Sequence, residues 1–333
     1  MKFALAGNII VDKIFPIRGF PPVGQLCPIL DGMSQSVGGV VCNDGIDLKR
    51  LLPAESVTAI GFVGQDADGD YALRYMQNEK LDCSLVRRSA RATSFTHVMN
   101  DAEARERTFF TYSGANDDLT PETVPLDAVE SGSLLLAGYI LLLKGLDAGD
   151  DEYGTKMARL LCEAKRRGIL TSVDVVSEAG DRFSRLVPPA LKYTDYCIIN
   201  ELEAGSATKI PLRDEKGALL TENIPAVLST MREMGVTKWA VIHAPEGAWG
   251  TDEKGRFASC ASVDLPKSEI RGKTGAGDAF CSGVIAGLHE DMTLPESLWL
   301  GGCAAALSLT TLGATDAIMN VEETLKFGEK WRQ

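Results

Sequence analysis

The chain has 333 residues, of which 45% are hydrophobic and 24% are charged, and its formal net charge is −12. This is the composition of a globular protein that can bury a sizeable core. The excess of acidic residues argues against a nucleic acid or an anionic membrane as partner, because those surfaces bind clustered Lys and Arg.

Short apolar segments alternate with longer helical patterns along the chain, which predicts the α/β class with a mostly parallel central sheet covered by helices. Segments that are apolar on both faces predict the central strands, at 3–10, 57–64, 133–139, 169–176, 195–200 and 238–243. The helical patterns lie at 44–52, 68–78, 153–167, 224–234, 277–289, 296–312 and 321–331.

Two stretches, 13–37 and 93–112, interrupt this rhythm. Their alternation of polar and apolar residues favours short antiparallel strands with one solvated face. We expect them to form a small sheet apart from the main one, either a lid over a cleft or an edge elaboration without function. With no linker or repeat in between, we expect one domain over residues 1–333.

The cysteines and the N-terminal residues indicate in which cellular compartment the protein is expected. No signal-peptide pattern opens the chain, and the longest apolar run, 134–143, is about half a membrane span. We therefore predict a cytoplasmic protein with reduced thiols in its core. The eight scattered cysteines are Cys27, Cys42, Cys83, Cys162, Cys197, Cys260, Cys281 and Cys303.

The strongest local motif is GKTGAGDAF at 272–280, where small residues lead into an amphipathic helix. Backbone N–H groups of such a loop and the helix N-terminus form a cradle for an anion such as a phosphoryl group. Asp278 at its mouth would accept the proton of an attacking hydroxyl. The alternative is a helix cap and a tight turn. A P-loop is excluded, because its first glycine position holds Lys267.

Polar residues follow two other predicted strands. Asn200 and Glu203 lie at the carboxyl end of the strand 195–200, where ligands of open α/β sheets gather. They could hold hydrated Mg²⁺, or only cap a helix. Near the N-terminus, Asp12, the pair at 38–39 and Asn43 could bind vicinal hydroxyls, or form an ordinary turn before a helix.

Four motifs occur together along the chain. In chain order they are the glycine pair with its following Asn at 38–43, GFVGQDADGD at 61–70, NELE at 200–203 and GAGDAF at 275–280. In this combination the chain resembles the ribokinase/PfkB carbohydrate kinase family over essentially its whole length. The resemblance implies a Rossmann-like α/β/α sandwich with a small β-sheet lid formed by about 13–37 and 93–112.

The resemblance also implies roles for individual residues. Asp278 matches the catalytic base, and the anion hole is matched by Gly275, Ala276 and Gly277. Asn200 and Glu203 match the pair that organises Mg²⁺ and its waters, Glu203 through water. The positions that hold substrate hydroxyls are matched by Asp12, Gly38, Gly39 and Asn43, and we add Lys273, Thr274 and Gly247 as nucleotide contacts.

Three features depart from the family pattern. Gly272-Lys273 replaces the usual Asp-Thr, whose Asp helps to bind a monovalent cation in many relatives, so potassium activation is left open. The loop 243–247 lacks the glycine that usually follows the strand near the nucleotide. Asp44 and Asp47 stand where relatives more often have small apolar residues.

We therefore expect transfer of the γ-phosphoryl of ATP, with Mg²⁺, to a hydroxyl, most simply a primary one, of a small sugar or sugar acid. A nucleoside kinase of the same family and an inactive sugar-sensing protein are the alternatives. Arg105 and Arg107 could meet a phosphate or carboxylate of the substrate, or stay solvated. Open strand edges of the predicted lid favour a homodimer.

Overall fold

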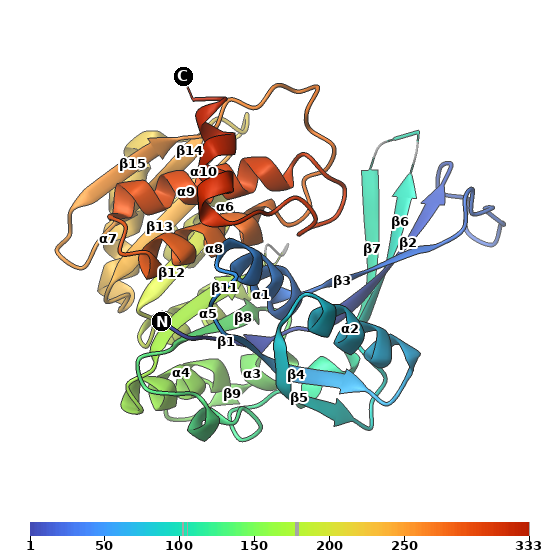
Figure 1. Cartoon of the computed structure of the whole chain (residues 1–333), viewed down its shortest axis with the longest axis horizontal. Coiled ribbons are helices and arrows are strands. Elements are labelled where there is room, and N and C mark those ends of the chain that lie inside the picture. Colours follow the sequence, from blue (N-terminus) through green and yellow to red (C-terminus); the bar gives the residue numbers. More distant parts are fainter. Residues whose placement is uncertain (102, 105, 177–179, 333) are drawn as a thin grey trace.

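A nine-stranded sheet forms the centre of the molecule (Figure 1). The computed structural model describes residues 1–101, 103–104, 106–176 and 180–332. The strand order is β15-β14-β13-β12-β11-β8-β1-β4-β5, and the seven strands from β5 to β13 run parallel. These strands are β1 (Phe3–Gly7), β4 (Val57–Gly64), β5 (Asp82–Ser89), β8 (Leu134–Ile140), β11 (Leu170–Val175), β12 (Tyr196–Asn200), β13 (Trp239–Ala244), β14 (Gly247–Thr251) and β15 (Phe257–Ala261).

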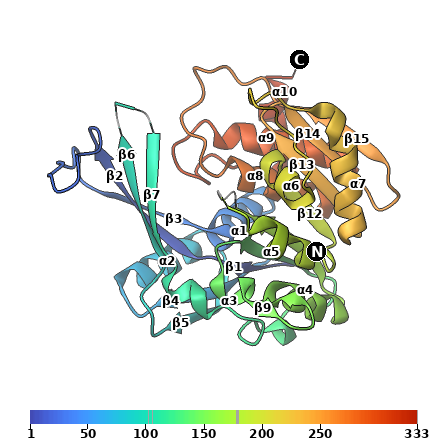
Figure 2. The same ribbon diagram turned by 180° about the vertical axis from the view of Figure 1, so that it is seen from behind.

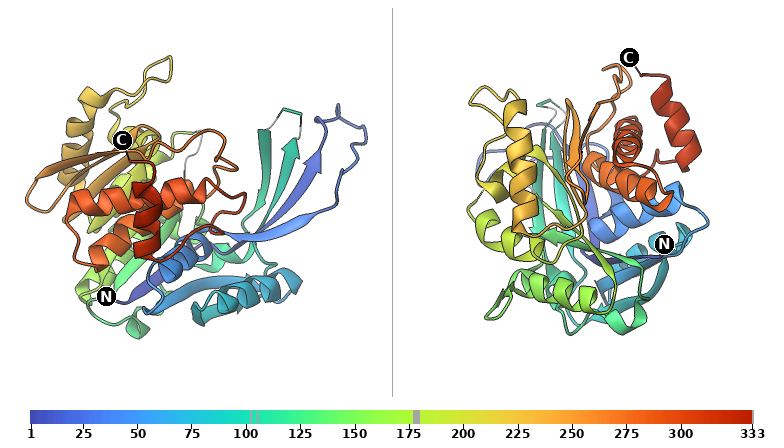
Figure 3. Two further views of the ribbon diagram at one scale, coloured as in Figure 1. Left: turned by 45° about the horizontal axis from the view of Figure 1, so that its top comes forward. Right: turned by 90° about the vertical axis from the view of Figure 1, so that its left-hand side faces the viewer.

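Helices cover both faces of this sheet, so the expected α/β/α sandwich is confirmed (Figures 1, 2 and 3). One layer holds α1 (Val40–Leu51), α2 (Ala67–Asn78), α8 (Ala276–His289), α9 (Leu294–Ser308) and, packed on α9, α10 (Val321–Glu329). The opposite layer holds α3 (Lys144–Asp147), α4 (Lys156–Arg166), α5 (Phe183–Leu191), α6 (Glu201–Thr208) and α7 (Ile224–Met234).

The alternation of side chains along β8 shows why its sequence is apolar throughout. Leu134 and Leu136 are buried in the core beneath α1 and α8, whereas Leu135 and Ala137 are buried in the core beneath α4 and α5. A parallel strand between two helical layers has no solvated face, so each position favours an apolar residue.

A second, four-stranded sheet stands away from the main one (Figures 1 and 3). We call it the small sheet; its order is β3-β2-β6-β7, with β2 (Ile10–Ile17), β3 (Ser34–Gly38), β6 (Phe95–Asp101) and β7 (Glu106–Tyr112). The outer pairs are antiparallel as expected, but β2 and β6 run parallel. Both follow a parallel strand of the main sheet, β1 and β5, and therefore leave it in the same direction.

The six central strands expected from the sequence are confirmed, and several other elements are additional. Strands β5, β14 and β15 and helices α5 and α6 were not expected. Helix α1 begins at Val40 rather than at 44, because Gly39 at φ 86° turns the chain directly into it. Short elements complete the chain: η1 (Gly114–Asp118), η2 (Leu126–Ala128), η3 (Thr221–Asn223), β9 (Gly149–Asp150) and β10 (Gly154–Thr155).

All eight cysteines are free thiols. Among the described residues, no helix combines the length and the apolar character that crossing a membrane requires.

Candidate active site

Helix α8 begins directly after the glycine-rich loop, and Gly275 shapes this junction. Gly275 precedes the first helical residue, Ala276, with φ 81°. A Cβ added to Gly275 would lie 2.6 Å from the backbone oxygen of Ala314. Both the left-handed conformation and the close approach therefore require glycine. The first N–H groups of α8, which have no partner within the helix, open toward this loop.

Asp278 lies in the first turn of α8 and accepts two short hydrogen bonds. Tyr139, at the end of β8, donates from its hydroxyl to Oδ1 at 2.6 Å. Asn43, in the first turn of α1, donates from Nδ2 to Oδ2 at 3.0 Å. Burial raises the pKa of the Asp278 carboxyl, and the hydrogen bonds from Tyr139 and Asn43 oppose this rise. Three elements that are distant in sequence thus hold one carboxylate.

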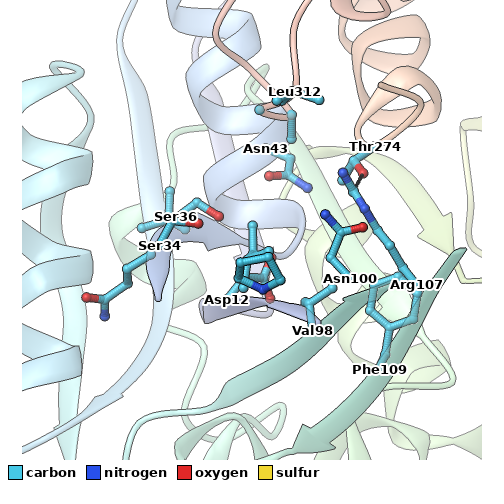
Figure 4. A pocket seen from close by; sticks show the side chains of 16 residues that line it. Asp12, Ser34, Ser36, Asn43, Val98, Asn100, Arg107, Phe109, Thr274 and Leu312 are labelled. Carbon is cyan, nitrogen blue, oxygen red and sulfur yellow. Dashed lines mark hydrogen bonds between the residues drawn. The ribbon is translucent and has the colours of Figure 1, made fainter. Parts of the chain in front are cut away.

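A pocket of about 310 Å³ lies next to this carboxylate, between the small sheet and the loops at the start of α8 and after α9 (Figure 4). Asn43 lines the pocket and so connects it to Asp278. Other polar residues of the lining come from the small sheet and from the loop before α8: Asp12, Ser34, Gln35, Ser36, Asn100, Arg107 and Thr274.

Asp12 stands on the wall that β2 contributes, and Gly38 makes room for it. A Cβ on Gly38 would lie 2.8 Å from Oδ2 of Asp12. Burial raises the pKa of Asp12 to about 6, against a hydrogen bond from Thr96 and the positive charge of Arg107. Near neutral pH this carboxylate is an acceptor for hydroxyl groups in the pocket.

Asn43 lines the pocket, and its amide nitrogen holds the Asp278 carboxylate. Its Nδ2 donates to Asp278 and lies 3.3 Å from the hydroxyl of Tyr139, whereas its Oδ1 is buried and has no partner among the described residues. A buried amide oxygen without a donor is costly. Because this oxygen has almost no accessible surface, a hydroxyl of a bound molecule can reach it only if the Asn43 side chain moves.

Arg107 crosses from β7 to the glycine-rich loop. Its Nη1 donates to Oγ1 of Thr274 at 2.6 Å, and both residues line the pocket (Figure 4). Thr274 immediately precedes Gly275, so the guanidinium lies beside the start of α8. Arg105, the other arginine considered from the sequence, lies outside the described residues.

Asn200 and Glu203 form a capping box at the start of α6. Oδ1 of Asn200 accepts the N–H groups of Leu202 and Glu203, and Oε2 of Glu203 accepts the N–H of Asn200. The capping interpretation thus accounts for these contacts, and a role toward Mg²⁺ stays a prediction. Glu203 is buried; burial raises the pKa of Asp174 at the end of β11, and the charges of Asp278 and Glu203 raise it further.

The remaining predicted nucleotide residues lie further from the pocket. Lys273 is exposed and is not part of the lining. Gly247 opens β14, directly after the turn from β13. On β13, His243 pairs in register with Asn200, and its ring stacks on Phe280 of α8 at 4.7 Å. Burial lowers the pKa of His243 to about 4, which leaves the imidazole neutral at neutral pH.

Gly272 has a structural reason to lack a side chain. A Cβ there would lie 2.7 Å from the backbone oxygen of Thr311. The acidic side chain that the family pattern has at this position therefore does not fit here unless the backbone moves.

Two residues of the site were not singled out from the sequence. Tyr139 and Asp174 both lie at the ends of strands that were expected, at 133–139 and 169–176. Polar groups at the carboxyl ends of parallel strands tend to face a ligand site, and this was the available signal. Their positions inside apolar runs favoured a core assignment instead.

Known proteins resemble this chain over nearly its whole length. A family model described as pfkB family carbohydrate kinase matches residues 14–320. The chain is 24% identical over 325 residues to the ribokinase of Haemophilus influenzae, with 97% of each chain covered. It is 25% identical over 294 residues to the adenosine kinase of Schizosaccharomyces pombe, which covers 84% of this chain and 82% of that one.

The fold is shared with solved structures. The Arabidopsis thaliana ribokinase complexed with ribose and ATP superposes with a TM-score of 0.77 at 17% identity, with 98% of both chains covered.

The capping box generates a prediction about stability. Asn200→Ala leaves the first N–H groups of α6 without their acceptor and should lower the free energy of unfolding by about 1 kcal/mol, whereas Asn200→Asp keeps the acceptor. Urea unfolding measures both. Asn320→Ala is the matched control, because Asn320 caps α10 through the N–H of Glu323 and should cost a similar amount. Unchanged stability in Asn200→Ala would contradict the capping role.

Proposed function

Because the chain belongs to the pfkB family of carbohydrate kinases, we propose that it transfers the γ-phosphoryl group of ATP to a primary hydroxyl of a small sugar or sugar acid. The observation that carries this proposal is the carboxylate of Asp278. Tyr139 and Asn43 hold it at the N-terminus of α8, beside a pocket lined with groups that bind hydroxyls.

In the proposed reaction, Asp278 accepts the proton of the substrate hydroxyl as its oxygen forms a bond to the γ-phosphorus. The bond from the γ-phosphorus to the bridging oxygen breaks, and ADP leaves. The N–H groups at 275–277 and the positive end of α8 stabilise negative charge on the transferring group. The small sheet, as a lid, keeps water away and so limits hydrolysis of ATP.

ATP and Mg²⁺ are the cofactors of this proposal. Mg²⁺ prefers oxygen ligands and keeps several of its waters. Asn200 and Glu203 supply such oxygens, and Glu203 is buried close enough to Asp174 for its charge to act on that carboxyl group. Bound Mg²⁺ would neutralise charge on the phosphates, with Glu203 acting through water. Gly272 has no side-chain oxygen that could bind K⁺. The cytoplasmic location of the protein stays a prediction.

The pocket supports a polyhydroxylated substrate with an acidic group. Asp12 is an acceptor for hydroxyls, and Arg107 is the one cationic side chain among the described residues of the lining. A nucleoside is the second candidate, favoured by the aromatic ring of Phe109 in the lining and by the adenosine kinase relative. A sensor without catalysis would bind these ligands and release no ADP.

The proposed reaction predicts measurable turnover. The protein with MgATP should release ADP with at least one member of a panel of pentoses, hexoses, sugar acids and nucleosides, assayed with and without K⁺. Asp278→Asn removes the proton acceptor and should lower kcat about 10²- to 10⁴-fold, the usual contribution of a general base. A coupled assay of ADP release measures both.

Thermal unfolding is the control, since Asp278→Asn should keep the folded structure. Near-wild-type turnover in this variant would refute the assignment of the base. ADP release by no panel member, together with ligand binding seen as a thermal shift, would favour the sensor.

A further prediction separates the substrate classes through Arg107. Arg107→Met should lower kcat/KM for a sugar acid by roughly 10- to 100-fold, because a charged hydrogen bond to the carboxylate is lost. For a neutral sugar of the same chain length the decrease should be much smaller. Arg332→Met is the matched control, an exposed arginine on the C-terminal segment. An equal loss for both substrates would contradict carboxylate recognition.

We also propose a homodimer through the outer face of the small sheet. The side chains that alternate with the pocket lining form an aromatic surface there. Phe95 contacts His97 and Tyr112 through ring pairs at 4.8 and 5.3 Å, and Phe110 is 54% exposed. An exposed aromatic surface on a sheet with open edge strands favours association with a second copy.

For this dimer, Phe110→Asp should shift the sedimentation coefficient from the dimer toward the monomer, because a charge would be buried at the interface. Phe257→Asp is the matched control: Phe257 is 51% exposed on β15, the edge strand of the main sheet that lies far from the small sheet. A wild-type protein that sediments as a monomer, or a Phe110→Asp protein that stays dimeric, would contradict this interface.

A further inference from the structure

Helix α1 carries a fully buried carboxyl group that the proposed reaction does not use. Asp44 follows Asn43 in sequence and has 0% exposure. Its contacts are weak: the Ser282 hydroxyl lies 3.4 Å from Oδ1, and the thiol of Cys281 is a poor donor. Oδ2 of Asp44 is buried and has no hydrogen-bond partner among the described residues.

Asp44 shares its surroundings with two other acids. One carboxylate oxygen each of Asp44, Asp174 and Asp278 lies within 4.8 Å of the others. Asp44 and Asp174 are buried and Asp278 is only partly exposed, so three ionised carboxylates at this separation would repel each other strongly and cannot all be charged. At least one must hold a proton, or a cation must lie between them.

The hydrogen bonds decide which acid holds the proton. Asp278 accepts the hydroxyl of Tyr139 and the amide of Asn43, two contacts that favour its ionised form. Asp174 accepts the backbone N–H of Val175 at 2.7 Å. Asp44 has no donor of comparable strength, so its ionised form is the least supported of the three.

Asp44 also lies close to Asp278, because one carboxylate oxygen of each residue lies within 4.8 Å of the other, and the unpartnered Oδ2 of Asp44 is available to carry a proton. Two carboxyl groups can share a hydrogen bond only if one of them is protonated. We propose that Asp44 is a positioning residue for the base, whose neutral carboxyl donates a hydrogen bond to the Asp278 carboxylate. This role rests on the proposed function, in which Asp278 must be ionised to accept the substrate proton.

The groups around this pair agree with a neutral Asp44. Burial, followed by the charges of Asp278, Asp174 and Asp47, raises the pKa of Asp44 well above its usual value. Burial and the charge of Asp278 likewise raise the pKa of Asp47 on the next turn of α1. The other ionisable groups facing the pair are Tyr139 on β8 and Cys281 on α8, and burial raises the pKa of both.

The role has a direct consequence for the pH dependence of the reaction. Activity needs the ionised base and therefore falls as the pH falls through the pKa of Asp278. A donated hydrogen bond stabilises the carboxylate and lowers this pKa. Losing the donor should raise the pKa and move the acid limb to higher pH. Removing a negative charge would have the opposite effect.

The experiment compares the acid limb of kcat/KM against pH in three variants. Asp44→Ala loses the donor, and its limb should move up by about one to two pH units. Asp44→Asn keeps a neutral donor, and its limb should stay at the wild-type midpoint. Asp47→Ala is the matched control: it removes a buried carboxyl one turn away that has no hydrogen bond to the base among the described residues, and its limb should not move.

Three results would overturn the proposal. A limb that moves to lower pH in Asp44→Asn would mean that Asp44 is ionised in the native protein. A limb unchanged in Asp44→Ala would mean that Asp44 does not act on the base. A wild-type midpoint that depends on the concentration of K⁺ or Mg²⁺, with the dependence lost in Asp44→Asn, would place a cation between the acids. If Asp44→Ala does not fold, Asp44→Asn still distinguishes a neutral from an ionised Asp44.

Infrared spectroscopy gives a readout that does not need turnover. The wild-type spectrum at neutral pH should contain the carbonyl stretch of a protonated carboxylic acid that is lost in Asp44→Asn and retained in Asp47→Asn. Absence of this band would refute the protonated Asp44 even if no substrate were known. Its presence in a protein that phosphorylates nothing would instead refute the proposed function.

Discussion

The proposed reaction depends on one constraint: the carboxylate of Asp278 must stay ionised although it is only partly in contact with water. Transfer of an isolated charge into the protein interior is costly, and a carboxyl group usually avoids the cost by taking up a proton. Here Tyr139 and Asn43 offset the burial with short hydrogen bonds. Asp278 also lies in the first turn of α8, where the positive end of the helix dipole stabilises its negative charge.

Meeting this constraint requires three elements to come very close together. The ends of β1 and β8 meet at Gly7 and Gly138, where a Cβ on Gly7 would lie 1.8 Å from the backbone oxygen of Gly138. Gly39 turns the chain into α1 directly beside Asn8. Because of these close contacts, Asn43 and the end of β8 lie next to the start of α8. The packing of the sheet, rather than the glycine-rich loop alone, thus defines the geometry of the base.

The sequence predicted the layers well because the central strands are apolar on both faces, a signal that depends on burial alone. It missed β14 and β15, whose hairpin is partly exposed and rich in small residues. Asp278, Asp12 and Asn43 were predicted as site residues because a polar residue beside glycines is locally conspicuous. Asp44 stood out as unusual, but its contact with Asp278 depends on how α1 packs against α8. Long-range packing of that kind leaves no pattern within either segment.

The charges around the pocket affect how strongly it can bind anions. The chain has a formal charge of −12, and carboxyl groups gather near the proposed base, yet the proposed ligands, ATP and a sugar acid, are anions. Binding them requires that local negative charge be reduced or opposed. Arg107 opposes it from the small sheet, at the cradle beside Thr274, and the N-terminus of α8 opposes it from beneath. A proton held on Asp44 would remove one charge directly behind Asp278. The same proton that keeps the base ionised would thereby also lower the repulsion that the incoming phosphoryl group meets.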